Sequence, residues 1–189
     1  MPRPPTISRS ELLAKLSGVF RQYGFDGASM QELSRVSGLS KASLYHHFPG
    51  GKEEMAGKVL GEEGVRLQQL VLAPLDVDNP FDALQGSLRG AAEFYGGDVP
   101  QCLMNSITLG HGGILFGTSV AAAVNTWRDR LSARYHDMGA NSDEAASWAK
   151  YAVERIQGAL VICRVQADRE PLVSCLEELE GDVRFVAEG

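Results

Sequence analysis

Several features that mark other classes of protein are absent from this sequence of 189 residues. The longest apolar run, residues 159–163, falls far short of the roughly 20 residues that cross a membrane, and no apolar segment follows the first residues. The three cysteines, Cys102, Cys163 and Cys175, form neither a CxxC pair nor a Cys/His cluster. These absences predict a cytoplasmic protein with no membrane contact, no disulfide framework and no metal site.

Signatures of catalysis are also missing. Gly50-Gly51-Lys52 lacks the first glycine of a phosphate-binding loop, and Glu53 stands where that loop needs serine or threonine. His111-Gly112-Gly113 is similar to the oxyanion loop of esterases, but no G-x-S-x-G nucleophile elbow exists in the chain. We therefore predict loops between helices at both places, a chain that is not an enzyme, and no cofactor.

Negative charge predominates, with a net charge of −6, but it is unevenly distributed. Residues 1–60 carry eight Lys/Arg against five Asp/Glu, whereas residues 61–189 carry ten against nineteen. Because the potential that steers a polyanion is local, the basic N-terminal part can approach nucleic acid despite the acidic total.

Apolar residues recur at helical spacing along almost the whole chain, and no segment alternates as a strand would. Gly24 is expected to end the first helix, and Ser29 with Glu32 forms a capping-box pattern at the start of the second. We predict an all-α fold with an N-terminal domain over residues 6–66 and a helical regulatory and dimerisation domain over 67–189. About nine helices are expected, near residues 12–23, 29–36, 40–48, 52–72, 81–95, 103–109, 120–138, 142–167 and 172–183.

The segment 29–48 has the pattern of a helix-turn-helix, in which two short helices flank a turn at Gly38 and small Ser34 allows their close crossing. The second helix is rich in donors for bases and phosphates: Lys41, Ser43, Tyr45, His46 and His47. Phosphate sites are expected at Ser29, with the free N–H groups that follow it, and at Lys52. A metal site at His46 and His47 is disfavoured, because neighbours on a helix do not face one ligand.

These residues resemble the DNA-binding domain of the TetR family of bacterial repressors. The resemblance is carried by Gly24-Phe25-Asp26-Gly27-Ala28-Ser29-Met30, Leu39-Ser40-Lys41-Ala42-Ser43-Leu44-Tyr45-His46-His47-Phe48 and Lys52-Glu53-Glu54-Met55. Further stretches look like the regulatory domain of the LmrA/YxaF-type branch: Gln101-Cys102-Leu103-Met104, Trp127-Arg128, Gly158-Ala159-Leu160 and Arg169-Glu170-Pro171-Leu172.

The resemblance implies a homodimeric repressor that binds double-stranded operator DNA. Lys41, Ala42 and Ser43 would then face the major groove. Phosphates would be held mostly by Tyr45, His46, His47 and Lys52. Ser34 departs from the alanine common in the family, but serine is small enough for the same crossing.

Dimerisation is expected through the helix near 142–167, because residues 159–163 are apolar all round and must be covered on two sides. One side would face the domain core and the other a second subunit, in a four-helix interface. The residues predicted for that interface are Ile156, Leu160, Leu172, Leu176 and Leu179.

A small aromatic or drug-like inducer is expected in the second domain, which is rich in large aromatic side chains. The candidate contacts are the aromatic residues Phe94, Tyr95, Phe116, Trp127, Trp148 and Tyr151 and the polar residues Asn105, His111, Asn125 and Arg155. Two alternatives stay open: a DNA-binding regulator with no ligand, and a ligand carrier that no longer binds DNA. Lys41, Tyr45 and Lys52 disfavour the carrier.

Overall fold

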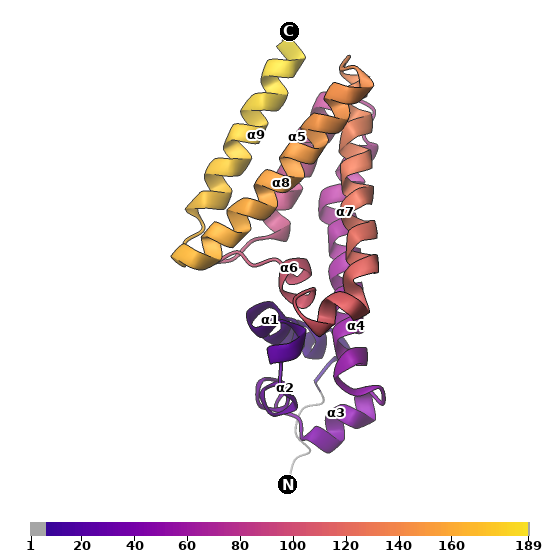
Figure 1. The fold of residues 1–189 in the computed structure, drawn as a ribbon, viewed down its shortest axis with the longest axis vertical. Helices are drawn as coiled ribbons and strands as arrows, with labels where there is room; N and C mark the ends of the chain where they lie inside the picture. Colours follow the sequence, from indigo (N-terminus) through magenta and orange to yellow (C-terminus); the bar gives the residue numbers. More distant parts are fainter. Residues whose placement is uncertain (1–6, 189) are drawn as a thin grey trace. The chain divides into compact units, whose positions relative to one another are not determined.

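The structure, a computed structural model, describes residues 7–188, and this range contains helices and no strand (Figure 1). The elements are α1 (Arg9–Gly27), α2 (Met30–Ser37), α3 (Lys41–His47), α4 (Gly51–Leu67), η1 (Gln68–Leu72), η2 (Ala73–Asp76), α5 (Pro80–Phe94), α6 (Leu103–Ile107), α7 (His111–Asp137), α8 (Ser142–Gln166) and α9 (Glu170–Glu188). The predicted all-α class with about nine helices is confirmed for this part of the chain. None of its helices has a stretch long and apolar enough to cross a membrane.

The chain forms two compact units whose division differs from the predicted one. Unit 1 contains the described residues up to Glu63 together with Leu103–Thr118, and unit 2 contains Gly64–Cys102 and the described residues from Ser119 onward. The first division lies near the predicted boundary at residue 66. The inclusion of α6 and the start of α7 in unit 1 has no counterpart in the sequence pattern, because it depends on packing against α1.

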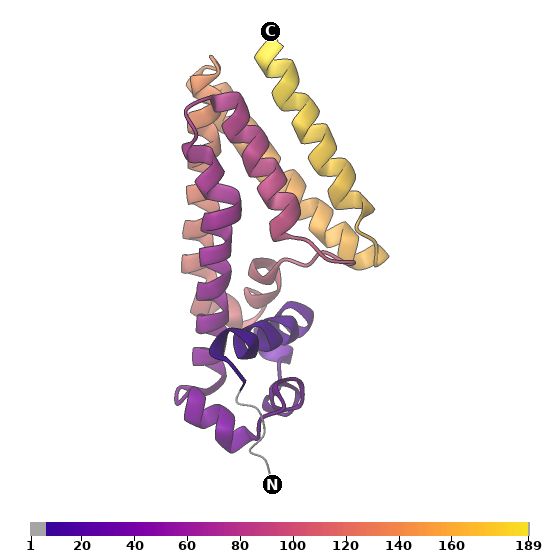
Figure 2. The ribbon, with the colours of Figure 1, turned by 180° about the vertical axis from the view of Figure 1, so that it is seen from behind.

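Unit 1 is built around α1, which packs on α2 and on α6 (Figure 2). Its core contains Leu16, Phe20, Leu33, Leu44 and Phe48, each with an exposed fraction of 0%. The helical spacing of these apolar residues accounts for the burial of one face of α1, α2 and α3.

The first helix does not end at Gly24, as predicted, but kinks there and continues to Gly27. Gly24 has φ 67°, and a Cβ built on it would lie 2.7 Å from the carbonyl oxygen of Ser106. Glycine therefore serves both the left-handed conformation and the close approach of α6.

The start of α7 also differs from the prediction. It lies at His111 rather than near residue 120, so His111-Gly112-Gly113 forms the first helical turn and not a loop. A Cβ at Gly112 would lie 1.9 Å from the oxygen of Ile107 and 2.8 Å from Cβ of Phe25. The glycines that resemble a loop in the sequence thus permit close packing at a helix start.

The long helix predicted over 52–72 changes geometry along its length. After α4, the π-helical turn η1 is followed by the 3-10 turn η2, which contains Pro74 in its first positions. Proline has no N–H to donate to an α-helix, so the regular helix cannot continue through this point.

Unit 2 is a helical bundle in which α5 packs against η1, η2 and α9, and α8 runs antiparallel to α9 (Figure 1). Trp127, Leu131, Ile156 and Leu160 are among its buried residues. Burial raises the pKa of the Cys163 thiol above its ordinary value, which disfavours the thiolate.

Candidate nucleic-acid interface

The turn between α2 and α3 is held by serine hydroxyls. Gly38 ends α2 in the left-handed conformation with φ 72°. Ser34 Oγ donates to the oxygen of Leu39 at 2.6 Å, and Ser37 Oγ donates to the oxygen of Leu33 at 2.7 Å. Ser34 is thus small enough for the crossing, as predicted, and also fixes the turn by a hydrogen bond that alanine could not make.

The third helix presents two different faces. Ser40 caps it by accepting from Ser43 N–H at 3.0 Å, and Leu44 is fully buried beneath it. The opposite side is exposed and carries Lys41, Ala42, Tyr45, His46 and His47, with Ser43 half-buried. Leu44 and Phe48 anchor the helix in the unit, so the donors predicted for DNA are available on a rigid support.

Several neighbours orient these exposed side chains. The Tyr45 ring lies against Gly51, and the ring of His47 lies 6.1 Å from that of His46 and 6.4 Å from that of Phe48. No group of three His, Cys, Asp or Glu side chains that could hold a metal ion occurs between residues 7 and 188.

Lys52 has a different environment from the one predicted. Its ammonium donates to the oxygen of Phe25 at 2.9 Å and lies 4.4 Å from the centre of the Phe25 ring. Glu54 accepts from Gly50 N–H at 2.9 Å, so a carboxylate already occupies the start of α4. The contact with Phe25 holds α4 against the end of α1, and the phosphate contact expected of Lys52 stays a prediction. Because Phe25 is distant in sequence, no local pattern indicated this contact.

Ser29 caps α2 by accepting from Glu32 N–H at 3.1 Å. The second half of the predicted capping box is not formed, since Glu32 accepts from Arg35 Nε at 2.9 Å instead. This hydrogen bond lowers the pKa of Glu32. The charge of Glu32 is paired with Arg35 at 2.5 Å, and the phosphate site expected at Ser29 stays a prediction.

Three of the predicted ligand contacts lie in unit 1, where two of them pack on the end of α1. The backbone N–H of His111 donates to Asp26 Oδ2 at 2.8 Å, and the His111 ring lies 6.2 Å from the Phe25 ring. The Phe116 ring meets the Phe25 ring edge-on at 5.6 Å. Asn105 lies half-buried in α6. These contacts give His111 and Phe116 structural roles within the unit.

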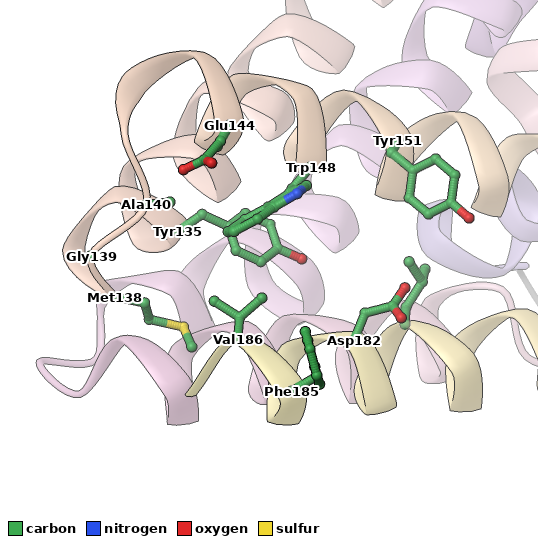
Figure 3. Close-up of a pocket in the computed structure, with 11 residues that line it drawn as sticks. Tyr135, Met138, Gly139, Ala140, Glu144, Trp148, Tyr151, Asp182, Phe185 and Val186 are labelled. Carbon is green, nitrogen blue, oxygen red and sulfur yellow. The ribbon is translucent and has the colours of Figure 1, made fainter. Parts of the chain in front are cut away.

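The other candidates lie in unit 2, where they differ in burial. Phe94 and Trp127 are buried, and the Phe94 ring packs edge-on against Tyr95 at 4.7 Å. Trp148 and Tyr151 both line a hollow that lies between α7, α8 and α9 (Figure 3). Phe94, Phe116 and Trp127 are buried within their units, as aromatic residues at helical spacing often are, and the predicted ligand contacts of these residues and of Asn105, His111, Trp148, Tyr151 and Arg155 stay predictions.

Unit 2 also contains buried polar atoms that lack a hydrogen-bond partner. Within the described residues these atoms are Trp127 Nε1, Arg128 Nε and Gln157 Oε1. The amide nitrogen of Gln157 donates to the hydroxyl of Tyr95 at 2.9 Å.

The five residues predicted for the dimer interface are core residues of unit 2. Their exposed fractions do not exceed 6%: Ile156, Leu160, Leu172, Leu176 and Leu179. The opposite face of α8 is apolar and exposed, with Val161 at 39%, Ile162 at 44% and Val165 at 75%. The helix α8 has apolar residues on two sides, as expected. Its exposed apolar side is formed by residues other than the five predicted for the interface.

Comparisons with known proteins agree with this geometry. Residues 12–59 match the family model for bacterial regulatory proteins of the tetR family, and residues 98–178 match the model for the C-terminal domain of LmrA/YxaF-like transcriptional regulators. The uncharacterised HTH-type transcriptional regulator YxaF of Bacillus subtilis is 25% identical over 94% of this chain and 95% of its own. The HTH-type transcriptional regulator LmrA of the same organism is 30% identical over 43% of this chain and 44% of its own.

Solved structures show the same fold. A cysteine mutant of the TetR family transcriptional regulator CifR, complexed with 26-base-pair double-strand operator DNA, superposes with a TM-score of 0.76 at 21% identity. The match covers 94% of this chain and 98% of that one.

Proposed function

Because the chain belongs to the TetR family, in its LmrA/YxaF-like branch, it is a DNA-binding transcriptional regulator, and we propose that it is a homodimeric repressor released from its operator by a small ligand. The observation that carries the proposal is the exposed donor-rich face of α3 on a buried anchor. Family membership also confirms the prediction that the chain is not an enzyme.

We propose that α3 enters the major groove. Lys41, Ala42 and Ser43, at the start of the helix, would contact base edges, as the first residues of a recognition helix do. Tyr45, His46 and His47 would contact phosphates and so fix the position of the helix. Ser29 would add a hydroxyl at the start of α2.

Two-fold symmetry is supported by the exposed apolar face of α8. Val161, Ile162 and Val165 lie on one side of the helix, opposite the buried Leu160 and Cys163. A second copy that presents the same face would cover it in a symmetric contact. The operator would then contain two related half-sites separated by about one turn of DNA or somewhat more, roughly 34 Å.

Ligand response is supported by the hollow in unit 2 that Trp148 and Tyr151 line, because small-molecule sites are concave and lined mainly by apolar and aromatic side chains. To act as an inducer, the ligand must bind better to the form that does not bind DNA, and its effect on operator affinity cannot exceed this difference.

The test begins with selection of duplexes from a random library by the purified protein, followed by binding measurements at several salt concentrations. A palindromic consensus, bound far more tightly than scrambled DNA, is the expected result. Flavonoid-like and antibiotic-like compounds are then titrated against the operator complex. Enrichment of no sequence would overturn the DNA-binding role. Specific DNA binding that no compound weakens would favour the regulator without a ligand.

A further inference from the structure

The hollow between the end of α7, the start of α8 and the end of α9 has the size of a ligand site. Its volume is about 740 Å³, within the usual range for small-molecule pockets. Four aromatic rings line it, from Tyr135, Trp148, Tyr151 and Phe185 (Figure 3). The Tyr135 and Trp148 rings meet edge-on at 5.6 Å, and Phe185 is 79% exposed. A large apolar ring so exposed at the mouth of a groove is available to a second molecule.

All the formal charge in the lining is negative. Glu144 and Asp182 are the only side chains of Asp, Glu, Lys, Arg or His among the eleven that line the groove, and they come from α8 and α9 respectively. Asn141 N–H donates to Glu144 Oε2 at 3.2 Å, which leaves the second carboxylate oxygen for a ligand. Burial and the negative charge of Asp182 raise the pKa of Tyr135 to about 12. The Asp182 carboxylate therefore acts on the aromatic wall of the groove.

The basic side chains next to the groove are already paired with other carboxylates. Arg155 pairs with Glu178 and lies over the Tyr151 ring at 5.2 Å. Arg184 pairs with Glu180 at 3.3 Å. Glu144 and Asp182 form no ion pair with any residue in the described range, so their charge is not neutralised by the protein.

We propose that this groove binds an organic cation with an aromatic or bulky apolar body, such as a quaternary ammonium or phosphonium ion. Aromatic faces attract such a cation through their quadrupoles, and the two carboxylates add a direct charge attraction. Both effects disfavour an anion of the same shape. A metal ion is not the expected occupant, because the described residues hold no group of three potential ligands. The inference deepens the ligand-responsive function proposed above by naming a ligand class.

The test uses two ions of nearly the same shape and opposite charge, tetraphenylphosphonium and tetraphenylborate, titrated into the full chain by calorimetry without DNA. Trp148 emission is followed in parallel in a Trp127→Phe variant, in which it is the only tryptophan. Tetraphenylphosphonium is expected to bind at least about tenfold more tightly than tetraphenylborate and to change Trp148 emission at saturation.

Substitutions test whether the carboxylates of Glu144 and Asp182 attract the cation. The double variant Glu144→Gln with Asp182→Asn should weaken the cation about tenfold or more and leave the anion unaffected or bound more tightly. Glutamine can still complete the cap with Asn141, so α8 should stay intact. Glu177→Gln, which removes an exposed carboxylate of α9 outside the groove lining, is the matched control and should change nothing.

Three outcomes would overturn the inference: equal binding of the two ions, unchanged cation affinity in the double variant, or Trp148 emission that depends on protein concentration because a second copy fills the groove. If the groove does not bind the cation, the proposed binding to operator DNA is not contradicted. Conversely, if the cation binds in the groove but does not weaken the operator complex, the site stands and the ligand-responsive function fails there.

Discussion

At Lys52, the side chain joins α4 to α1 through the oxygen and the ring of Phe25. Lys52→Met keeps most of the apolar stem but removes the ammonium, and should lower the free energy of unfolding by about 1–3 kcal/mol. The measurement is a urea titration at fixed protein concentration, since the stability of a dimer depends on concentration. Lys58→Met changes an exposed lysine of the same helix and should have little effect.

The same variant distinguishes the two roles of Lys52. A positioning role predicts that the slope of log affinity against log salt for operator DNA stays the same in Lys52→Met. A fall of about one unit would restore the phosphate contact expected from the sequence.

Substitutions of Tyr45 and Ser43 should change DNA binding in different ways. Tyr45→Phe removes one hydroxyl from the exposed face and should weaken binding to all duplexes by roughly 0.5–1.5 kcal/mol. Ser43→Ala should instead relax preference at one base position, by about 1–3 kcal/mol at most. Anisotropy titrations against the operator and single-base variants separate these effects. Tyr23→Phe, at a similarly exposed tyrosine of α1, is the control.

Tyr135 links stability to alkaline pH. Because its pKa is raised to about 12 from an ordinary value of 10, the folded protein retains the phenolic proton more strongly than the unfolded chain does. The stabilisation is fully present below pH 10 and is lost as the pH rises toward 12, by at most about 2–3 kcal/mol. Tyr135→Phe should therefore show a shallower fall of melting temperature between these pH values. An unchanged pH profile would contradict the assignment.

Among the helices, α2 and α3 could be predicted most closely, since caps, turn glycine and buried positions all lie within a short segment. The predictions failed where a partner distant in sequence decides the geometry. Gly24 has the local pattern of a helix end, yet the approach of Ser106 sets its conformation. The outward face of α8 was expected, but its residues were not identified, because the pattern of an all-apolar segment does not tell which side packs on α9.

Gly112 in the first turn of α7 tests the close packing of that helix on α6 and α1. Gly112→Ala would place a methyl group into the oxygen of Ile107 and against Phe25, and should destabilise the protein by about 1–3 kcal/mol or more. Gly117→Ala in the same helix meets nothing within 4 Å and should be neutral or stabilising by up to about 1 kcal/mol. Equal melting temperatures of the two variants would contradict the packing at Gly112.

For the whole molecule, the exposed face of α8 predicts the assembly state. Val165→Lys places a charge in the proposed apolar interface and should shift the protein toward monomer, with weaker operator binding because the two half-sites are no longer held together. Sedimentation across micromolar concentrations measures the first effect. Val77→Lys, at an exposed valine outside α8 and α9, should leave the dimer intact. A wild-type protein that sediments as a monomer would refute the interface.

The membership of α6 and the start of α7 in unit 1 bears on how the protein opens and unfolds. Segments that pack together tend to exchange their amide hydrogens as one cooperative group, whatever their order in the chain. The amides of 103–118 should therefore share the protection of α1 rather than that of α5. A gene fragment that stops at residue 63 would encode α1 without the segment that packs on Gly24 and Phe25. An isolated DNA-binding domain would therefore have to include residues 103–118 as well.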